Sequence, residues 1–284
     1  MDVEQARTFL AIAAHGSFLE AAKRIHVTQS TVSARIQNLE SELGAQLFVR
    51  NRSGATLTPA GRRFMQHAKA LVLTVEQARH DVGLPSRYQS VVRIGGRIAL
   101  WEDFLPNWVG WMRRAAPDVA IRSEIGFEED LMRRLVEGTL DIGVMYTPSH
   151  APGLIVEHLF DETLVMVSTD PQTRWPGDDY VYVEWGPGFY AKHRESYPDL
   201  ARPPQVVNIG WLGIQLILAN GGSCFLPIRM ARSLIEAGKL YQVSSAPEFP
   251  HPAYMVFPRE ANSEFLQQAV EGLRELARKE LARR

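Results

Sequence analysis

The feature that most constrains this chain is a pair of closely spaced amphipathic helices between Ser17 and Gly44. Ser17, followed three residues later by Glu20, has the form of a capping box and predicts a short helix. Thr28 is a second N-cap candidate, and apolar residues recur after it at the spacing of one helix face: Val32, Ile36, Leu39 and Leu43. A first helix precedes them, with apolar residues at Val3, Ala6, Leu10 and Ala13. Two short helices joined by a tight turn indicate a helix-turn-helix.

The outer face of the helix after Thr28 suits insertion into a DNA groove. It carries small or amide-bearing side chains: Ser30, Ser33, Ala34 and Gln37, with Gln29 at the helix start. A helix in the major groove needs little bulk, hydrogen-bonding tips and no acid facing phosphate. We expect Gln29 to bond an adenine edge, and Arg35 at the flank to reach a phosphate. The alternative is an ordinary solvated helix face.

A β-hairpin with a basic tip is expected next. Leu47–Arg50 and Ala55–Leu57 are short strand-like runs, separated by the turn-forming segment 51–54. Arg50 and Arg52 lie at this tip, where guanidinium groups would hold the DNA backbone or the minor groove as a wing.

A long helix is predicted from Thr58 and Pro59, because threonine caps it and proline takes its tolerated first position. Its apolar residues alternate four and three apart: Leu57, Gly61, Phe64, Ala68, Leu71, Val75, Ala78 and Val82. This spacing is typical of a coiled coil, so we expect the central five, from Phe64 to Ala78, to pair two copies of the chain. Packing of the stripe on its own domain is the alternative. Gly83–Ser86 predicts a linker.

Taken together, these segments resemble the LysR-type transcriptional regulators. The likeness covers residues 2–80 almost without a gap. The resemblance implies DNA contacts by five side chains: Gln29, Ser30, Ser33, Arg50 and Arg52. Family members commonly have arginine where this chain has Ala34, so its operator preference should differ. We expect a homodimer that assembles into a tetramer on double-stranded operator DNA, with RNA polymerase as a further candidate partner.

Beyond residue 90, strand-like and helix-like segments alternate, which indicates βαβ units and parallel strands. The first region has expected strands at 91–95, 119–125 and 141–145, and helices at 100–115 and 127–137. The second has strands at 180–184, 206–207 and 224–226, and helices at 189–196, 209–219 and 228–237. Strands at 157–160 and 164–168 bridge the two regions, and a strand at 254–257 and a helix at 263–282 close the chain.

The expected fold class is therefore α+β and multidomain. We assign a winged helix-turn-helix to residues 1–58, a dimerising linker helix to 59–86 and an effector-binding domain to 91–284. The last is expected to be a two-lobed α/β domain like the periplasmic binding proteins, as in LysR-type regulators. Its lobes are predicted at about 91–162 with 258–284, and at about 163–257.

Ligands in α/β lobes bind at the carboxyl ends of strands, near helix N-termini. Candidates in lobe one are Gly96, Arg97, Ile98, Trp101, Tyr146 and Thr147, and in lobe two Trp185, Gly186, Phe189 and Gly222. Arg97 with three aromatic rings would suit an aromatic or amphiphilic acid through charge pairing and stacking. The alternative is that these rings form lobe core and that Arg97 is an ion-pair partner.

Charge and composition fit a DNA reader joined to a different module. Residues 1–90 carry a formal charge of +4 and the rest −5, and all six tryptophans lie beyond residue 90. Cys224, the single cysteine, indicates a reducing compartment, and no segment resembles a signal peptide or membrane span, so we expect a cytoplasmic protein. No catalytic, metal or cofactor motif is found. The sequence predicts a transcriptional regulator controlled by a small effector; a ligand-independent repressor is the alternative, and an enzyme is the remaining rival.

Overall fold

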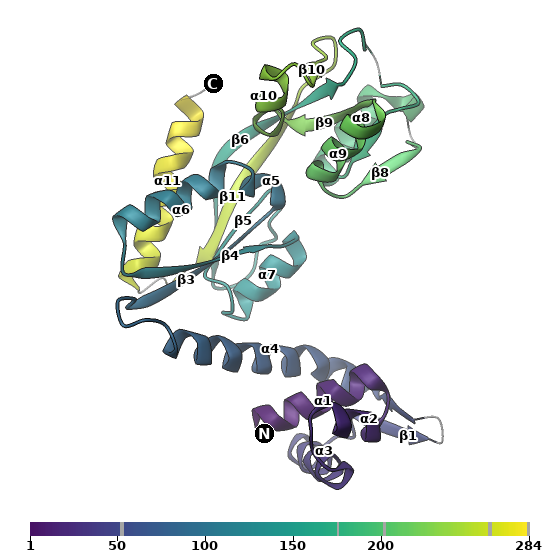
Figure 1. Ribbon diagram of the computed structural model, residues 1–284, viewed down its shortest axis with the longest axis vertical. Coiled ribbons are helices and arrows are strands. Elements are labelled where there is room, and N and C mark those ends of the chain that lie inside the picture. The colour runs from purple at the N-terminus through teal and green to yellow at the C-terminus, as the bar shows by residue number, and fades with distance from the viewer. Residues whose placement is uncertain (52–53, 175, 201–202, 261–262, 283–284) are drawn as a thin grey trace. The chain divides into compact units, whose positions relative to one another are not determined.

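The computed structural model describes residues 1–51, 54–174, 176–200, 203–260 and 263–282, and divides the chain into two compact units (Figure 1). The first unit is Met1–Pro85 and the second is Ser86–Arg284. Each unit has its own hydrophobic core, so each is described by itself.

The first unit is a winged helix-turn-helix followed by a long helix. Its elements are α1 (Val3–His15), α2 (Phe18–Arg24), α3 (Gln29–Leu43), β1 (Phe48–Asn51), β2 (Gly54–Leu57) and α4 (Pro59–Val82). The ring of Phe9 holds its core together, because it packs 5.1 Å from Phe48 and 5.0 Å from Phe64, measured between ring centroids. This joins α1, the wing and the start of α4 in one cluster.

Side-chain caps begin all four helices of this unit. The Ser17, Thr28 and Thr58 side chains each accept a hydrogen bond from the backbone three residues on, as predicted. The full capping box is at Asp2 and Gln5, which the sequence analysis did not identify. Gly44 ends α3 in the left-handed conformation as expected. The predicted stripe of α3 stops one turn early, because Leu43 is 41% exposed beside this C-cap.

The apolar stripe of α4 divides into two parts. Phe64 and Ala68 are 8% and 0% exposed and pack inside the core of their own unit. Both side chains present little surface to a partner chain, so they belong to the core of their own unit more than to an open seam. Leu71 and Val75 are half-buried, Ala78 is exposed and Val82 is 88% exposed. The C-terminal half of α4 thus has an apolar stripe that its own unit does not fully cover.

The second unit is built on a seven-stranded mixed sheet. Its lobe-one elements are β3 (Ser90–Gly96), α5 (Ile98–Trp101), α6 (Phe104–Ala115), β4 (Val119–Ile125), α7 (Glu128–Val136) and β5 (Ile142–Met145). Strand β3 pairs in parallel with both β4 and β5, as the alternating pattern predicted. The predicted helix over residues 100–115 is divided at Glu102 and Asp103 into α5 and α6.

Lobe two contains a smaller two-stranded parallel sheet with three helices nearby. Its elements are β7 (Val181–Val183), α8 (Pro187–Ser196), the 3-10 turn η1 (Pro198–Leu200), β8 (Gln205–Val207), α9 (Gly210–Asn220), β9 (Ser223–Pro227) and α10 (Ile228–Glu236). Strand β10 (Tyr241–Gln242), which the sequence analysis missed, pairs with the main sheet.

Two long antiparallel strands connect the lobes (Figure 1). They are β6 (Leu154–Ser168), predicted as two separate strands, and β11 (Phe249–Pro258). One end of β6 pairs with β9 and β10, while Tyr254–Val256 of β11 pair with β5. The return to lobe one therefore occurs within β11, earlier than the predicted boundary at residue 257. The register shifts between Ala253 and Tyr254, which marks a β-bulge.

Helices cover both faces of the lobe-one sheet. The closing helix α11 (Glu264–Ala282) packs beside α6, and the indole of Trp108 donates a 2.9 Å hydrogen bond to the carbonyl of Ala269. Helix α7 covers the opposite face through a separate apolar cluster around Leu131 and Leu135. In the part of the chain that is described, no helix combines the length and apolarity needed to cross a bilayer.

Candidate functional sites

The groove-facing surface of α3 has the exposure that DNA reading requires. Gln29 and Ser30 are exposed at its first turn, Gln37 is exposed further along, and Ser33 is half-buried. The opposite face is anchored, because the three apolar residues that precede Leu43 in the stripe are fully buried: Val32, Ile36 and Leu39. Thr28 caps the helix and also lies 2.8 Å from the Ser30 hydroxyl, which holds this first turn in place.

The predicted arginines of this surface differ in their surroundings. Arg35 lies 3.4 Å from the Glu4 carboxylate and 3.3 Å from the Thr8 hydroxyl, so it joins α3 to α1 instead of being free for a phosphate. The Arg50 guanidinium is exposed and lies 3.8 Å above the ring of Phe18. Arg52 falls outside the described residues.

A close backbone contact fixes the wing against the helices. The Ala55 amide donates a 2.7 Å hydrogen bond to the Gly16 carbonyl. Gly54 has a φ of +135°, and a Cβ there would lie 2.3 Å from the Gly16 oxygen. Only glycine permits this approach without a shift of the backbone, so the sequence at Gly54 sets the position of the wing relative to the helix-turn-helix.

The second candidate site is a pocket of about 160 Å³ within the second unit, lined from both lobes. Its lining residues are Arg97, Phe127, Glu128, Tyr146, Thr147, Glu184, Trp185, Gly186 and Asn208. The lobes approach closely at one point, since a Cβ on Gly186 would lie 3.4 Å from the Thr147 methyl group. Gly186 has a φ of +102°, which other residues rarely adopt.

Arg97 lies in this pocket but is already partnered. Its side chain is 9% exposed, its Nε lies 3.3 Å from a Glu128 oxygen, and its guanidinium lies 4.4 Å above the Phe127 ring. The ion-pair alternative considered for Arg97 therefore describes its geometry in this structure, while its edge still lines the pocket.

Tyr146 connects the pocket to a buried polar cluster. Its ring packs against His251 with centroids 3.9 Å apart and planes tilted by 31°, and its hydroxyl donates a 2.6 Å hydrogen bond to Glu162. Arg229 of α10 pairs with the same carboxylate and donates a 2.9 Å bond to the carbonyl of Ala99. Burial and the negative charge of Glu162 raise the pKa of Tyr146 well above its usual value, so its hydroxyl keeps its proton.

His251 carries no charge at neutral pH. Its side chain is buried, and burial together with the charge of Arg97 lowers its pKa to about 3. Its Nε2 is buried without a hydrogen-bond partner among the described residues. The wall behind Tyr146 is therefore a neutral aromatic surface.

Five predicted effector residues do not line the pocket. Gly96 is a packing position, because a Cβ there would lie 2.4 Å from Leu105. Ile98 is half-buried on α5, outside the lining. Phe189 belongs to the lobe-two aromatic core, 5.7 Å from Phe225 and 5.3 Å from Phe249.

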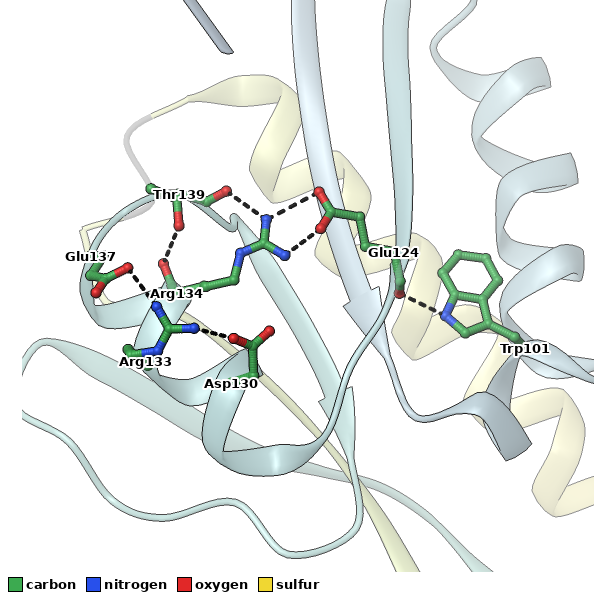
Figure 2. Close-up of polar contacts among 7 residues, drawn as sticks. All are labelled: Trp101, Glu124, Asp130, Arg133, Arg134, Glu137 and Thr139. Atoms are coloured by element: carbon green, nitrogen blue, oxygen red, sulfur yellow. Dashed lines mark hydrogen bonds and ion pairs between the residues drawn. The ribbon is translucent and has the colours of Figure 1, made fainter. Parts of the chain in front are cut away.

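Trp101 and Gly222 are the other two predicted effector residues that do not line the pocket. Figure 2 shows the Trp101 indole donating to the backbone oxygen of Glu124, 3.0 Å away, so the ring packs on β4. Gly222 forms a turn with a φ of +114°, where a Cβ would lie 2.2 Å from the Asp179 oxygen. Trp101 therefore packs in the core and Gly222 shapes a turn, and neither lines this pocket.

Polar contacts attach the last turn of the pocket helix α7 to strand β4. The Arg134 guanidinium meets the Glu124 carboxylate with both terminal nitrogens, and one of them also approaches the Thr139 carbonyl (Figure 2). Arg133 pairs along the helix with Asp130 and Glu137 (Figure 2). The contact between Arg134 and Glu124 ties α7 to β4, and α7 carries Glu128 at its first position, beside the pocket.

Four lining residues were not predicted from the sequence: Phe127, Glu128, Glu184 and Asn208. Phe127 and Glu128 follow the end of β4, and Asn208 follows the end of β8. The rule that ligands bind at carboxyl ends of strands would have found these three if it had been applied to every strand. Glu162, Arg229 and His251 come from distant elements, and no local motif marked them.

A winged helix-turn-helix joined to a two-lobed α/β domain with a pocket between its lobes defines a DNA-binding regulator with a ligand-binding domain. Residues 3–62 match the family model described as "Bacterial regulatory helix-turn-helix protein, lysR family", and residues 86–282 match the "LysR substrate binding domain". The chain belongs to the LysR family of transcriptional regulators. Members of this family are regulators and not enzymes, which removes the enzyme rival.

Curated relatives match the chain over most of their own length. The HTH-type transcriptional regulator HdfR of Yersinia enterocolitica is 28% identical over 278 residues, covering 94% of each chain. HdfR of Salmonella typhimurium is also 28% identical, over 260 residues, covering 90% of this chain and 92% of the relative.

Solved structures confirm the fold. The crystal structure of CbnR, a LysR family transcriptional regulator, matches with a TM-score of 0.70 at 20% identity, covering 98% of this chain and 99% of CbnR. Full-length CbnR complexed with its target DNA matches with a TM-score of 0.52 at 21% identity, covering 98% and 100%. LysG from Corynebacterium glutamicum with bound effector Arg matches with a TM-score of 0.53 at 18% identity, covering 98% and 99%.

Proposed function

We propose that this LysR-type regulator reads its operator with the first turn of α3 and holds the flanking backbone with the wing. The proposed base-reading residues are Gln29, Ser30 and Ser33, with Arg50 and Arg52 on the backbone. The exposure of the α3 face opposite a fully buried stripe carries this proposal. The bound CbnR structure supports it as a fold-level analogy, since that regulator was crystallised with target DNA. In this proposal residues 1–58 form the DNA-reading domain.

Selection of genomic fragments by the purified full-length protein tests this function. We expect enrichment of a short sequence with two half-sites, because a dimer presents two recognition helices one helical turn or a multiple apart. Absence of any enrichment at low ionic strength, where phosphate contacts are strongest, would contradict the proposal. A protein that reads a bacterial genome works in the cytoplasm, which is the location we propose.

We infer that residues 59–86 dimerise the chain through Leu71, Val75 and Ala78. Family members form oligomers, and the half-buried to exposed apolar residues of this part of α4 support a helix pair. We propose further that dimers assemble into a tetramer and that the DNA-bound assembly contacts RNA polymerase. Mass measurement in solution tests the first step, and co-purification with RNA polymerase on operator DNA tests the last.

We propose that residues 91–284 bind a small acid in the pocket between the lobes. Of the predicted effector residues, the pocket is lined by Arg97, Tyr146, Thr147, Trp185 and Gly186. Binding would shift the population of lobe arrangements and thereby the DNA spacing that the oligomer holds. Because all six tryptophans lie in this unit, a metabolite screen read by intrinsic fluorescence and melting temperature tests the site.

One observation favours a ligand-independent repressor as a second candidate. Arg97 is paired with Glu128 and stacked on Phe127, so the polar group best suited to an acid already has a partner within the chain. In that case the metabolite screen would give no response, and operator binding would be unchanged by Arg97→Met. A response to any metabolite that Arg97→Met removes would exclude this candidate.

A further inference from the structure

The charges around the pocket leave one carboxylate unbalanced. Of the described lining residues, Arg97 carries positive charge, and Glu128 and Glu184 carry negative charge. Glu128 pairs with Arg97 at 3.3 Å, so these two charges compensate each other. The Glu184 side chain is exposed and has no hydrogen bond or ion pair with any residue that the structure describes. The pocket therefore presents a free negative charge to an entering molecule.

Charged groups behind the pocket wall do not change this balance. Arg229 pairs with Glu162, and both side chains are almost fully buried. His251 packs against Tyr146 and is neutral at pH 7, because burial and the charge of Arg97 lower its pKa to about 3. A carboxylic acid without an amine would thus share Arg97 with Glu128, meet no second cation, and leave the free Glu184 carboxylate without a partner.

The aromatic residues next to Glu184 suit a cation. Trp185 follows Glu184 directly, and its ring meets Tyr146 edge-on, with centroids 6.4 Å apart and planes at 89°. The Trp185 indole is held in place by a 2.7 Å hydrogen bond to the Phe225 carbonyl. Aromatic faces attract ammonium groups, and they do so most strongly where water is excluded. Glu184, Trp185 and Tyr146 line the same pocket, so together they offer a protonated amine a carboxylate and aromatic rings.

Another part of the same pocket suits an anion. Three helices of nine or more residues begin at lining residues or within two residues of one: α7 after Phe127, α8 after Gly186 and α9 after Asn208. None of these three has a side-chain cap. Their first backbone N–H groups, which in α8 come after Pro187 because proline has none, lack intrahelical acceptors and favour a carboxylate, to which Arg97 adds its charge.

We propose that the effector is a small zwitterion, whose protonated amine is held by Glu184 against Trp185 and Tyr146, and whose carboxylate faces Arg97 and the helix N-termini. This inference rests on the proposed function of the pocket as the effector site. The volume of about 160 Å³ lies below the range of roughly 300–1,000 Å³ for drug-sized ligands, so the molecule has few heavy atoms. An amino acid or a short amino carboxylate meets all of these conditions.

Binding of matched probes to the full-length protein tests the proposal. The standard amino acids and 4-aminobutyrate are titrated to about 10 mM, above the Kd of a weak ligand, with tryptophan fluorescence and melting temperature as readouts. For each compound that binds, the acid lacking the amine and the amine lacking the acid are titrated next. We expect both to bind at least about ten-fold more weakly, since the acid leaves Glu184 without a cation and the amine makes no contact with Arg97 or the helix N-termini.

Variants of Glu184 assign the amine contact. Glu184→Gln keeps the size of the side chain and should weaken zwitterion binding about ten-fold or more. Glu184→Lys should reverse the order, so that the acid analogue binds more tightly than the zwitterion. Glu195→Gln is the matched control, because Glu195 is an exposed glutamate of α8 outside the pocket lining, and affinity should not change.

The outcomes separate this proposal from the function on which it rests. If an acid binds as tightly as its amino analogue and Arg97→Met removes both, the pocket is the effector site and the amine contact is wrong. An unchanged affinity in Glu184→Gln also overturns the proposal. If none of these probes binds, the zwitterion is excluded, and the effector function itself fails only if the broad metabolite screen gives no response.

Discussion

Arg229 of α10 and Glu162 of β6 form an ion pair in which both side chains are buried, 6% and 5% exposed. The Nε of Arg229 lies 2.8 Å from Glu162 Oε1, and a terminal nitrogen of the same guanidinium holds the Ala99 carbonyl of lobe one. The other terminal nitrogen is buried without a hydrogen-bond partner in the described part of the chain. Since Tyr146 bonds the other oxygen of Glu162, this pair joins α10, β6, α5 and the pocket wall.

Removing one member of this pair should destabilise the second unit strongly. Arg229→Met leaves Glu162 buried and unpaired, and we expect the free energy of unfolding to fall by about 3–5 kcal/mol. Adding Glu162→Gln to Arg229→Met should recover part of this loss, because the unpaired charge is removed. Denaturant unfolding followed by tryptophan fluorescence measures the second unit alone, since all six tryptophans are there.

The exposed pair of Arg278 and Glu271 is the control for this experiment. Their side chains are 66% and 50% exposed, so Arg278→Met should change the free energy of unfolding by less than about 1 kcal/mol. A loss in Arg229→Met as small as that in Arg278→Met would contradict the role given to the buried pair.

Buried histidines should make the second unit less stable in acid. Burial lowers the pKa of His193 to about 4, against about 6.5 in an unfolded chain. Between these values the unfolded chain binds a proton that the folded one does not, so stability is complete above pH 6.5 and falls as the pH drops. Each such histidine should contribute a slope of up to about 1.4 kcal/mol per pH unit.

Two variants isolate the contribution of His193. His193→Phe should remove about 1.4 kcal/mol per pH unit from the slope between pH 4 and 6.5. It should also lower stability at pH 7 by about 1–3 kcal/mol, because the buried Tyr180 hydroxyl, 2.8 Å from His193 Nε2, loses its partner. His150→Gln, at an exposed position, is the control. An unaltered slope in His193→Phe would refute the assignment.

Charge in the C-terminal half of α4 should separate the subunits. Val75→Lys places an ammonium group in the proposed seam, where its desolvation is unfavourable, and light scattering should give the mass of a smaller oligomer or a monomer. Leu73→Lys is the matched control, since Leu73 is 38% exposed and lies off the stripe. An unchanged mass in Val75→Lys would show that the chain pairs elsewhere.

Base reading and backbone contact should respond differently to substitution. Gln29→Ala removes a bond to a base edge and should weaken specific binding by about 1–3 kcal/mol, with little effect on random DNA. Arg50→Ala should weaken both and reduce the salt slope by about one unit. Binding titrations at several salt concentrations distinguish the two. Equal losses on both DNAs in Gln29→Ala would assign Gln29 to the backbone.

The local pattern predicted most of the fold because its signals lie within single elements. A few neighbouring residues determine each of these features: the helix caps at Ser17, Thr28 and Thr58, the helix end at Gly44, and the hairpin. Parallel pairing of β3 with β4 and β5 followed from the alternation of strands and helices. The union of two predicted strands into β6 was missed, because a polar stretch at 161–163 interrupts a strand that only its partner β11 makes continuous.

The site was predicted less completely because its residues depend on distant contacts. Arg97 and Tyr146 were found from the ends of strands, yet Glu128, which neutralises Arg97, lies thirty-one residues further along the chain, at the start of α7. Trp101 and Phe189 look like ligand contacts in sequence, since an aromatic ring in a pocket and one in a core have the same local pattern. Phe64 shows the same limit, because a heptad pattern is the same whether the apolar stripe packs on its own domain or on a second chain.

The strands β6 and β11 have a mechanical consequence for how this domain can respond to a ligand. Two lobes joined by flexible segments could rotate freely relative to each other. Here the lobes are joined by strands β6 and β11, which pair at ten positions. Any relative movement must therefore be absorbed as twisting of that ladder, concentrated at the irregular step beside Ala253. A ligand can therefore change the angle between the two lobes only as far as the paired strands β6 and β11 can twist.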